Sequence, residues 1–223
     1  MQPRALDLEA VFFLDAQADL RSVIGWTVSQ EELLSADGIA DRWVVLGQRV
    51  EEEDRLQVQR TWLQGLESGR SALILQFAHG RQPFEPTGLV PGAAFDGELA
   101  FFPSKFPLRA VVKTRSGDLV QSAMAAHKSL SIAIATYGTA VSKFPWLDRI
   151  AVALGGVVPI RTEAGWQVVD RDEFAMPLAP GFAAGWRLMA VSGGHPVTIC
   201  GEWNGASLLP MGVVADGRYT NLT

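Results

Sequence analysis

Residues 41–62 read DRWVVLGQRVEEEDRLQVQRTW, and this stretch decides the fold. Apolar and polar side chains alternate along residues 56–62, and residues 43–50 are rich in valine and leucine. A repeat of two is typical of β-strands, so the stretch predicts two of them. Four consecutive carboxylates at residues 51–54 lie between the strands. They predict a solvated hairpin turn, because like charges repel one another in a packed interior.

Three further alternating runs follow, near residues 73–77, 99–101 and 108–112, with Gly, Pro and Ser clusters between them. Five strands joined by short connections are typical of a small barrel or sandwich. We therefore expect a β-barrel-like region over residues 41–116, with OB-like and SH3-like barrels as the alternatives.

The residues before this region predict helices. Ser29 precedes two glutamates, as an N-cap precedes a short helix. We expect an N-terminal helical segment over residues 1–40, packed on the sheet that follows. Its apolar side chains recur at steps of three and four as far as Gly25; they are Leu8, Val11, Phe12, Leu20, Val23 and Ile24.

After Gly117 the apolar side chains adopt the spacing of a helix. The apolar stripe starts at Val120 and reaches Val141, and Pro145 disfavours helical geometry in the residue before it. We therefore expect a linking helix within residues 117–145.

The last third, residues 146–223, predicts an antiparallel β region. Its dipeptides are those of two-residue hairpin turns, which require positive φ angles. These are Gly193-Gly194, Asn204-Gly205 and Asp216-Gly217, between expected strands at residues 186–191, 197–203, 207–214 and 219–222. The expected fold class is mainly β with α (α+β).

The composition describes a chain that can bury a core without help. Of its 223 residues, 48% are hydrophobic, and the formal charge is −5. Its single cysteine, Cys200, excludes an internal disulfide, and the N-terminus lacks the pattern of a secretory signal, so we expect a cytoplasmic protein. The apolar stretch at residues 130–141 is shorter than the roughly 20 residues a membrane span needs.

No spacing of side chains in the sequence points to catalysis or to a cofactor. The residues that bind soft metals lack the close pairs of a zinc site; they are His79, His127, His195 and Cys200. The G-x-S-x-G elbow and the two common nucleotide-binding loops are missing from the sequence. Asp170, Asp172 and Glu173 indicate a solvated turn rather than a pair of catalytic carboxylates. We therefore predict a non-catalytic protein with no metal and no cofactor.

Aromatic and basic side chains are the candidates for binding. The seven tryptophans lie mostly in or beside predicted strands, where large aromatics fill a core or form a binding platform. The basic run at residues 105–115 falls on the outer face of a strand, where charges ordinarily serve solvation. The candidate binding residues are Trp43, Trp62, Trp186, Trp203, Lys105, Arg109 and Lys113.

Several stretches together resemble the C-terminal region of bacterial SWIM zinc finger family proteins. They are DRW (41–43), LGQRVEEEDRL (46–56), VQRTW (58–62), FAHG (77–80), SGG (192–194) and GEW (201–203). The likeness extends from about residue 15 to residue 223, and residues 43–62 are its most specific part.

The resemblance implies an accessory role in a multi-protein assembly. In the family, zinc is held by a C-x-C…C-x-H finger upstream of the region resembled here, and no position of this chain matches it, so no zinc ligand is carried over. Such fingers are regarded as DNA-binding or protein-interaction modules. These bacterial proteins occur with AAA-type ATPases and von Willebrand factor A-type proteins, which are the protein partners that the resemblance implies.

Two functions remain open at the level of sequence. The first is a protein-binding or adaptor module, which predicts an exposed apolar patch with tryptophan. The alternative is a single-stranded nucleic-acid-binding barrel, which predicts an aromatic side chain and the cations of residues 105–115 on one groove. An enzyme ranks third, since it needs His79 or His195 in a cleft beside a carboxylate and a nucleophile.

Overall fold

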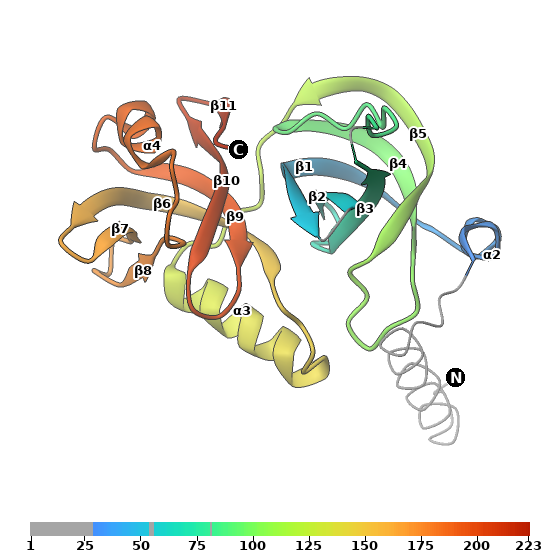
Figure 1. Ribbon diagram of the computed structural model, residues 1–223, viewed down its shortest axis with the longest axis horizontal. Coiled ribbons are helices and arrows are strands. Elements are labelled where there is room, and N and C mark those ends of the chain that lie inside the picture. The colour runs from blue at the N-terminus through green and yellow to red at the C-terminus, as the bar shows by residue number, and fades with distance from the viewer. Residues whose placement is uncertain (1–28, 54–55, 81) are drawn as a thin grey trace.

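The computed structural model describes residues 29–53, 56–80 and 82–223. Within these residues the chain is mainly β with α, as the sequence predicts; it has two antiparallel sheets and three helices. Strands β1–β5 make up one half of the molecule in Figure 1, and β6–β11 the other. The helix expected from the apolar pattern of residues 8–24 lies outside the described residues.

The first sheet has the strand order β3-β2-β1-β4-β5. A parallel bridge between Leu73 and Arg109 joins its two edges, and the Leu73 amide donates to the Leu108 carbonyl at 2.7 Å. The order around the closed sheet is therefore 1-2-3-5-4, that of an OB-like barrel, which is one of the two expected alternatives. Its strands are β1 (Ile39–Glu53), β2 (Leu56–Gly65), β3 (Ser71–His79), β4 (Ala93–Phe101) and β5 (Ala110–Gln121).

The second sheet has the order β11-β10-β9-β6-β7-β8. The turns at Asn204-Gly205 and Asp216-Gly217 join β9 to β10 and β10 to β11, as predicted. Both residues have the predicted positive φ at Asp216-Gly217, whereas at Asn204-Gly205 only the glycine does. The strands of this sheet are β6 (Ile150–Thr162), β7 (Gly165–Val169), β8 (Ala175–Pro177), β9 (Val197–Trp203), β10 (Leu208–Ala215) and β11 (Arg218–Asn221).

The prediction of a strand at residues 186–191 is wrong, because this segment forms the helix α4 (Gly185–Ser192). Leu188 and Ser192 are buried and lie four residues apart on one helical face. Gly193 has a φ of 57° and ends the helix in the left-handed conformation, which glycine adopts at little cost. The Gly193-Gly194 pair is thus a helix end and not a hairpin turn.

The linking helix starts later than its apolar stripe suggests. The strand β5 continues to Gln121, and α3 (Leu130–Lys143) begins only after the Ser129 side chain, which accepts from the Ile132 amide. Its end before Pro145 agrees with the prediction. The stripe misleads because Met124 and Ala126 pack against an apolar cluster that includes Trp62 and Met211. The His127 amide also donates to the Ala153 carbonyl and so fastens this segment to β6.

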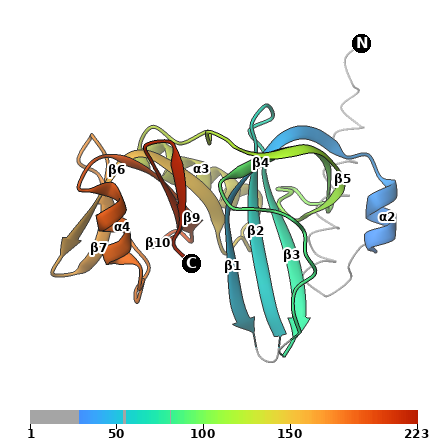
Figure 2. The same cartoon turned by 90° about the horizontal axis from the view of Figure 1, so that it is seen from above.

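The short helix α2 (Gln30–Ser35) is capped as expected, because the Ser29 hydroxyl accepts from the Glu32 amide at 3.1 Å. It lies on the side of the first sheet that faces away from the second sheet (Figure 2). No helix within the described ranges is long and apolar enough to cross a membrane.

Three apolar clusters hold the fold together. One fills the barrel and includes Trp43 and Phe95. A second lies between the sheets, where Trp62 of β2 and Met211 of β10 belong to the same cluster. The third packs α3 and α4 on the far face of the second sheet and includes Leu130. The two sheets therefore share part of the core.

Candidate functional site

A bulge in β1 determines which side chains meet between the sheets. The register with β2 shifts between Val45 and Gly47, so Val45 lies opposite Leu63 and Gly47 lies opposite Trp62. One extra residue reverses the alternation of faces along a strand. As a result, the odd-numbered residues after the bulge, Arg49 among them, face the second sheet instead of the barrel interior.

Five charged side chains from both sheets converge there, and we call them the Arg/Glu cluster: Arg49, Glu51, Arg60, Arg149 and Glu202. Arg49 Nη1 lies 3.0 Å from Glu202 Oε2, and Arg149 Nη1 lies 3.3 Å from the same oxygen. Glu51 pairs with Arg149 at 3.1 Å, with Arg60 at 2.8 Å and with Arg49. The cluster joins β1, β2 and β9 to the residue that precedes β6.

Glu202 is the most deeply buried member of the cluster. Its side chain is 2% exposed, whereas those of Arg49 and Arg149 are 26% and 28% exposed. Its second oxygen accepts from Trp62 Nε1 at 2.7 Å, so three donors from three segments satisfy one carboxylate. A buried charge requires this degree of compensation.

The cluster also shifts the pKa of two of its members, Glu51 and Arg149. Burial alone would raise the pKa of Glu51, but the charges of Arg149 and Arg49 and the hydrogen bond from Arg60 hold it below its ordinary value. Burial acts to lower the pKa of Arg149, and the two carboxylates beside it raise that pKa above its usual range. Glu51 and Arg149 are therefore both ionised at neutral pH.

The prediction of a solvated turn at residues 51–54 is wrong for Glu51. The strand β1 continues to Glu53, and Glu51 lies opposite Val58 in the β1–β2 pair. Its Arg149 partner is 98 residues away in the sequence, so the local run of carboxylates carries no sign of it. The stretches LGQRVEEEDRL, VQRTW and GEW supply four of the five members of the cluster.

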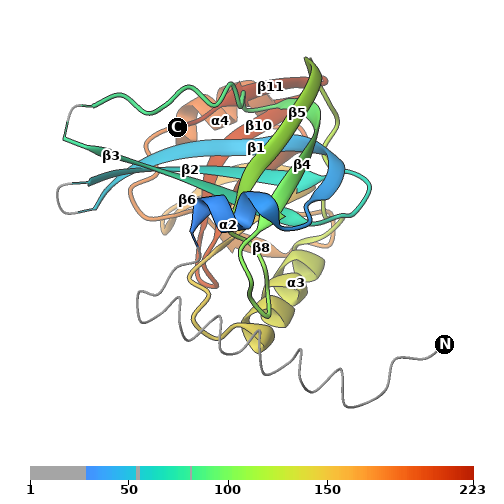
Figure 3. The same ribbon diagram turned by 90° about the vertical axis from the view of Figure 1, so that its right-hand side faces the viewer.

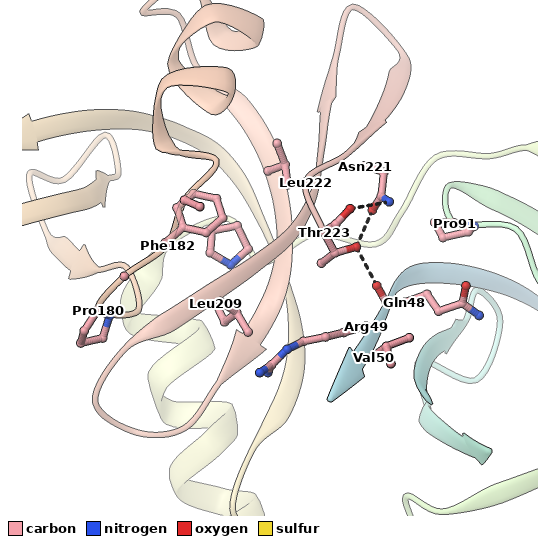
Figure 4. A pocket seen from close by; sticks show the side chains of 13 residues that line it. Gln48, Arg49, Val50, Pro91, Pro180, Phe182, Leu209, Asn221, Leu222 and Thr223 are labelled. Carbon is pink, nitrogen blue, oxygen red and sulfur yellow. Dashed lines mark hydrogen bonds between the residues drawn. The ribbon is translucent and has the colours of Figure 1, made fainter. Parts of the chain in front are cut away.

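An open cleft of about 620 Å³ adjoins the cluster between the two sheets (Figure 4). The end of β1, the segment before α4 and the β10–β11 hairpin form its walls. Arg49 projects into it, and the Thr223 hydroxyl donates to the Gln48 carbonyl at 2.9 Å across it. We call this the inter-sheet cleft; it is lined by Gln48, Arg49, Val50, Pro91, Pro180, Gly181, Phe182, Ala183, Leu209, Pro210, Asn221, Leu222 and Thr223.

The tryptophans predicted to bind occupy different environments. Trp43, Trp62 and Trp203 are buried in three different apolar clusters, whereas Trp186 is 71% exposed. Trp186 stands edge-on to Trp166 at 5.0 Å between ring centroids. The structure thus does not bring the four candidates together. Trp146 is a further exposed indole, and Trp26 lies outside the described residues.

The basic run of residues 105–115 makes local contacts. Lys113 pairs with Glu98 at 3.3 Å and donates to the Ala36 carbonyl at 2.6 Å. The Arg109 guanidinium lies 4.4 Å from the centroid of the Phe102 ring, and burial lowers its pKa. Lys105 is partly buried in the loop before β5. None of the three lines the inter-sheet cleft.

The other chemically interesting residues are separated. His79 and His195 are exposed, while burial lowers the pKa of His127 and raises that of Cys200 to about 12. In the part of the chain that the structure describes, no group of His, Cys, Asp and Glu side chains is arranged to hold a metal ion.

The solvated turn predicted for the acidic group at residues 170–173 is correct for Asp172 and Glu173, which are exposed. It is wrong for Asp170, which is buried and accepts from the amides of Leu130, Asp172 and Phe174. Asp170 thereby fastens the start of α3 to the turn after β7.

No protein-family model, curated protein or solved structure matches this chain. The arrangement of its own residues is therefore the evidence on function. We take the inter-sheet cleft as the candidate site, because it combines residues from both sheets, an accessible apolar lining and a charged side chain.

Proposed function

We propose that the protein is a non-catalytic binding module whose inter-sheet cleft takes a segment of a protein partner. The observation that supports this best is the lining of the cleft. Phe182, Leu209 and Leu222 give it apolar walls, and the Arg49 guanidinium gives it a directional polar contact. Binding sites in proteins are typically concave and mostly apolar, with a small number of placed polar groups.

The resemblance to SWIM zinc finger family proteins is consistent with this role. The stretches that carry the resemblance also build the Arg/Glu cluster at the edge of the cleft. An adaptor in a multi-protein assembly, with an AAA-type ATPase or a von Willebrand factor A-type protein as the partner, is the cellular setting that we propose.

A capture experiment tests this proposal. The purified chain is used as bait in a lysate of its source organism, with and without nuclease, next to two variants of equal bulk. Leu209→Trp fills the cleft, whereas Ile132→Trp adds the same indole to α3, where Ile132 is 50% exposed. A protein that binds the wild type and Ile132→Trp in both nuclease arms, and is lost with Leu209→Trp, supports the proposal. Equal recovery by all three baits contradicts it.

A single-stranded nucleic-acid-binding barrel is the second candidate, and the OB-like strand order favours it. Such barrels bind their ligands on the face of strands 2 and 3. On that face Phe77 is 53% exposed, two residues along β3 from Leu75, which lies opposite Arg60. Figure 3 shows β1, β2 and β3 extending together past the rest of the molecule. Binding of a labelled 20-residue oligothymidylate that weakens steeply with salt would support this candidate.

A further inference from the structure

Among the described residues, one charged side chain lines the inter-sheet cleft. Arg49 is the only charged side chain among the 13 described residues that line it. The polar side chains beside it, those of Gln48, Asn221 and Thr223, are uncharged, and the other lining residues are apolar or glycine. A single cation in largely apolar surroundings is complementary to a ligand that brings one negative charge and apolar surface.

The Arg49 guanidinium has hydrogen-bonding capacity left for such a ligand. It carries five N–H donors, and among the described residues its ion pairs are with Glu51 through Nη2 and with Glu202 through Nη1. Its side chain is 26% exposed, compared with 17% for Glu51 and 2% for Glu202. The cation therefore lies toward the cleft, and its two carboxylate partners lie behind it.

From this geometry we infer that the segment bound in the cleft carries an aspartate or glutamate beside an apolar residue, and that Arg49 binds this carboxylate. The inference rests on the proposed function and specifies its ligand. A peptide fits better than a nucleic acid, because a phosphate backbone calls for a row of cations and this cleft has one, on a chain whose formal charge is −5.

The test begins with a random 12-residue peptide library displayed on phage and selected on the purified full chain. The most enriched peptides are synthesised with a fluorescent label, once unchanged and once with each Asp or Glu replaced by Asn or Gln. Dissociation constants are measured by fluorescence anisotropy for the wild type and the variants Arg49→Gln, Asn221→Asp and Asn204→Asp.

The two asparagine variants are a matched pair. Asn221→Asp adds a negative charge to the cleft without changing the size of the exposed side chain; Oδ1 still accepts from the Thr223 hydroxyl, and the hydrogen bond from Nδ2 to the Thr223 carbonyl oxygen is lost. Asn204→Asp adds the same charge at the β9–β10 turn, where the retained Oδ1 still accepts from the Ala206 and Ser207 amides. Both positions are exposed, so the comparison remains valid even if Arg49→Gln fails to fold.

We expect enriched peptides in which an acidic residue adjoins apolar residues. Neutralising that residue, or replacing Arg49 by glutamine, should weaken binding about 10- to 100-fold, the effect of losing a charged hydrogen bond. Asn221→Asp should weaken binding about 3- to 10-fold, and Asn204→Asp less than 2-fold.

The inference would be overturned if the dissociation constant stayed the same when the acidic residue of the peptide is neutralised, or when Arg49 is replaced by glutamine. Displacement of the peptide from the wild type by an oligothymidylate would also overturn it. The proposed function survives those results if Leu209→Trp still abolishes binding of the peptide. It fails separately if no selected peptide is sensitive to Leu209→Trp.

Discussion

Replacing Glu202 by glutamine is expected to lower the free energy of unfolding by about 2–3 kcal/mol. Removing one partner of a buried ion pair costs about 3–5 kcal/mol, because the other charge is left buried without compensation. Here the cost is smaller, since Arg49 and Arg149 are each about a quarter exposed and both keep Glu51 as a partner. The new amide oxygen can still accept from Trp62, but the amide nitrogen places a donor against the guanidinium donors.

Urea unfolding at pH 7, followed by tryptophan fluorescence and by far-UV circular dichroism, measures this loss. Asp96→Asn is the matched control, because Asp96 lies 3.9 Å from Arg42 and both side chains are about half exposed. Such a surface pair contributes roughly 0–1 kcal/mol. If Glu202→Gln costs no more than Asp96→Asn, then Glu202 is not a structural link between the sheets. Because the sheets share a core, both probes should give the same midpoint in every variant.

Three further substitutions test other parts of the structure. Gly47→Ala should lower the free energy of unfolding in urea by about 1–3 kcal/mol, since a Cβ there would lie 2.6 Å from the Met211 side chain of β10. Gly138→Ala in α3 is the control: a Cβ there has open space, so this variant should stabilise the chain by up to about 1 kcal/mol. Trp62→Phe should lower the free energy of unfolding by about 1–2 kcal/mol more than Trp203→Phe in the same assay. Trp62→Phe removes a hydrogen bond to the Glu202 carboxylate, whereas Trp203 Nε1 has no hydrogen-bond partner among the described residues. Asp170→Asn should cost about 1–2 kcal/mol at pH 7. The hydrogen bond from the Leu130 amide, with others, lowers the pKa of Asp170 in the fold, although burial opposes this shift. The charged Asp170 therefore stabilises the fold above pH 4. In acid titrations of stability, the difference between wild type and variant should shrink as the pH falls from 4 to 2.

Structural features that depend only on residues adjacent in the sequence could be predicted from it. The Asn204-Gly205 and Asp216-Gly217 turns, and the cap at Ser29, rely on dihedral angles and hydrogen bonds within a few residues. The same local reasoning fails at Gly193, because a glycine with positive φ serves equally well in a hairpin turn and at the end of a helix.

The candidate site could not be predicted, because it depends on contacts between residues far apart in the sequence. Arg49 and Glu202 are 153 residues apart, and the alternation rule places Arg49 on the wrong face unless the bulge in β1 is known. The bulge has a sequence signal in Gly47, but a glycine within a strand pattern also occurs for other reasons. Trp62 and Trp203 are predicted as binding residues but are buried, since the composition of the chain does not distinguish a core indole from an exposed one.

The structural role of the Arg/Glu cluster can be separated from its proposed role in binding. Arg49 and Arg149 both pair with Glu51 and Glu202, but only Arg49 lines the inter-sheet cleft. A loss of stability that is common to variants at both arginines therefore reports the link between the sheets. A loss of peptide affinity confined to Arg49 reports the cleft. The bulge that turns Arg49 toward the second sheet makes both roles possible, since it places one guanidinium in the cluster and in the cleft at once.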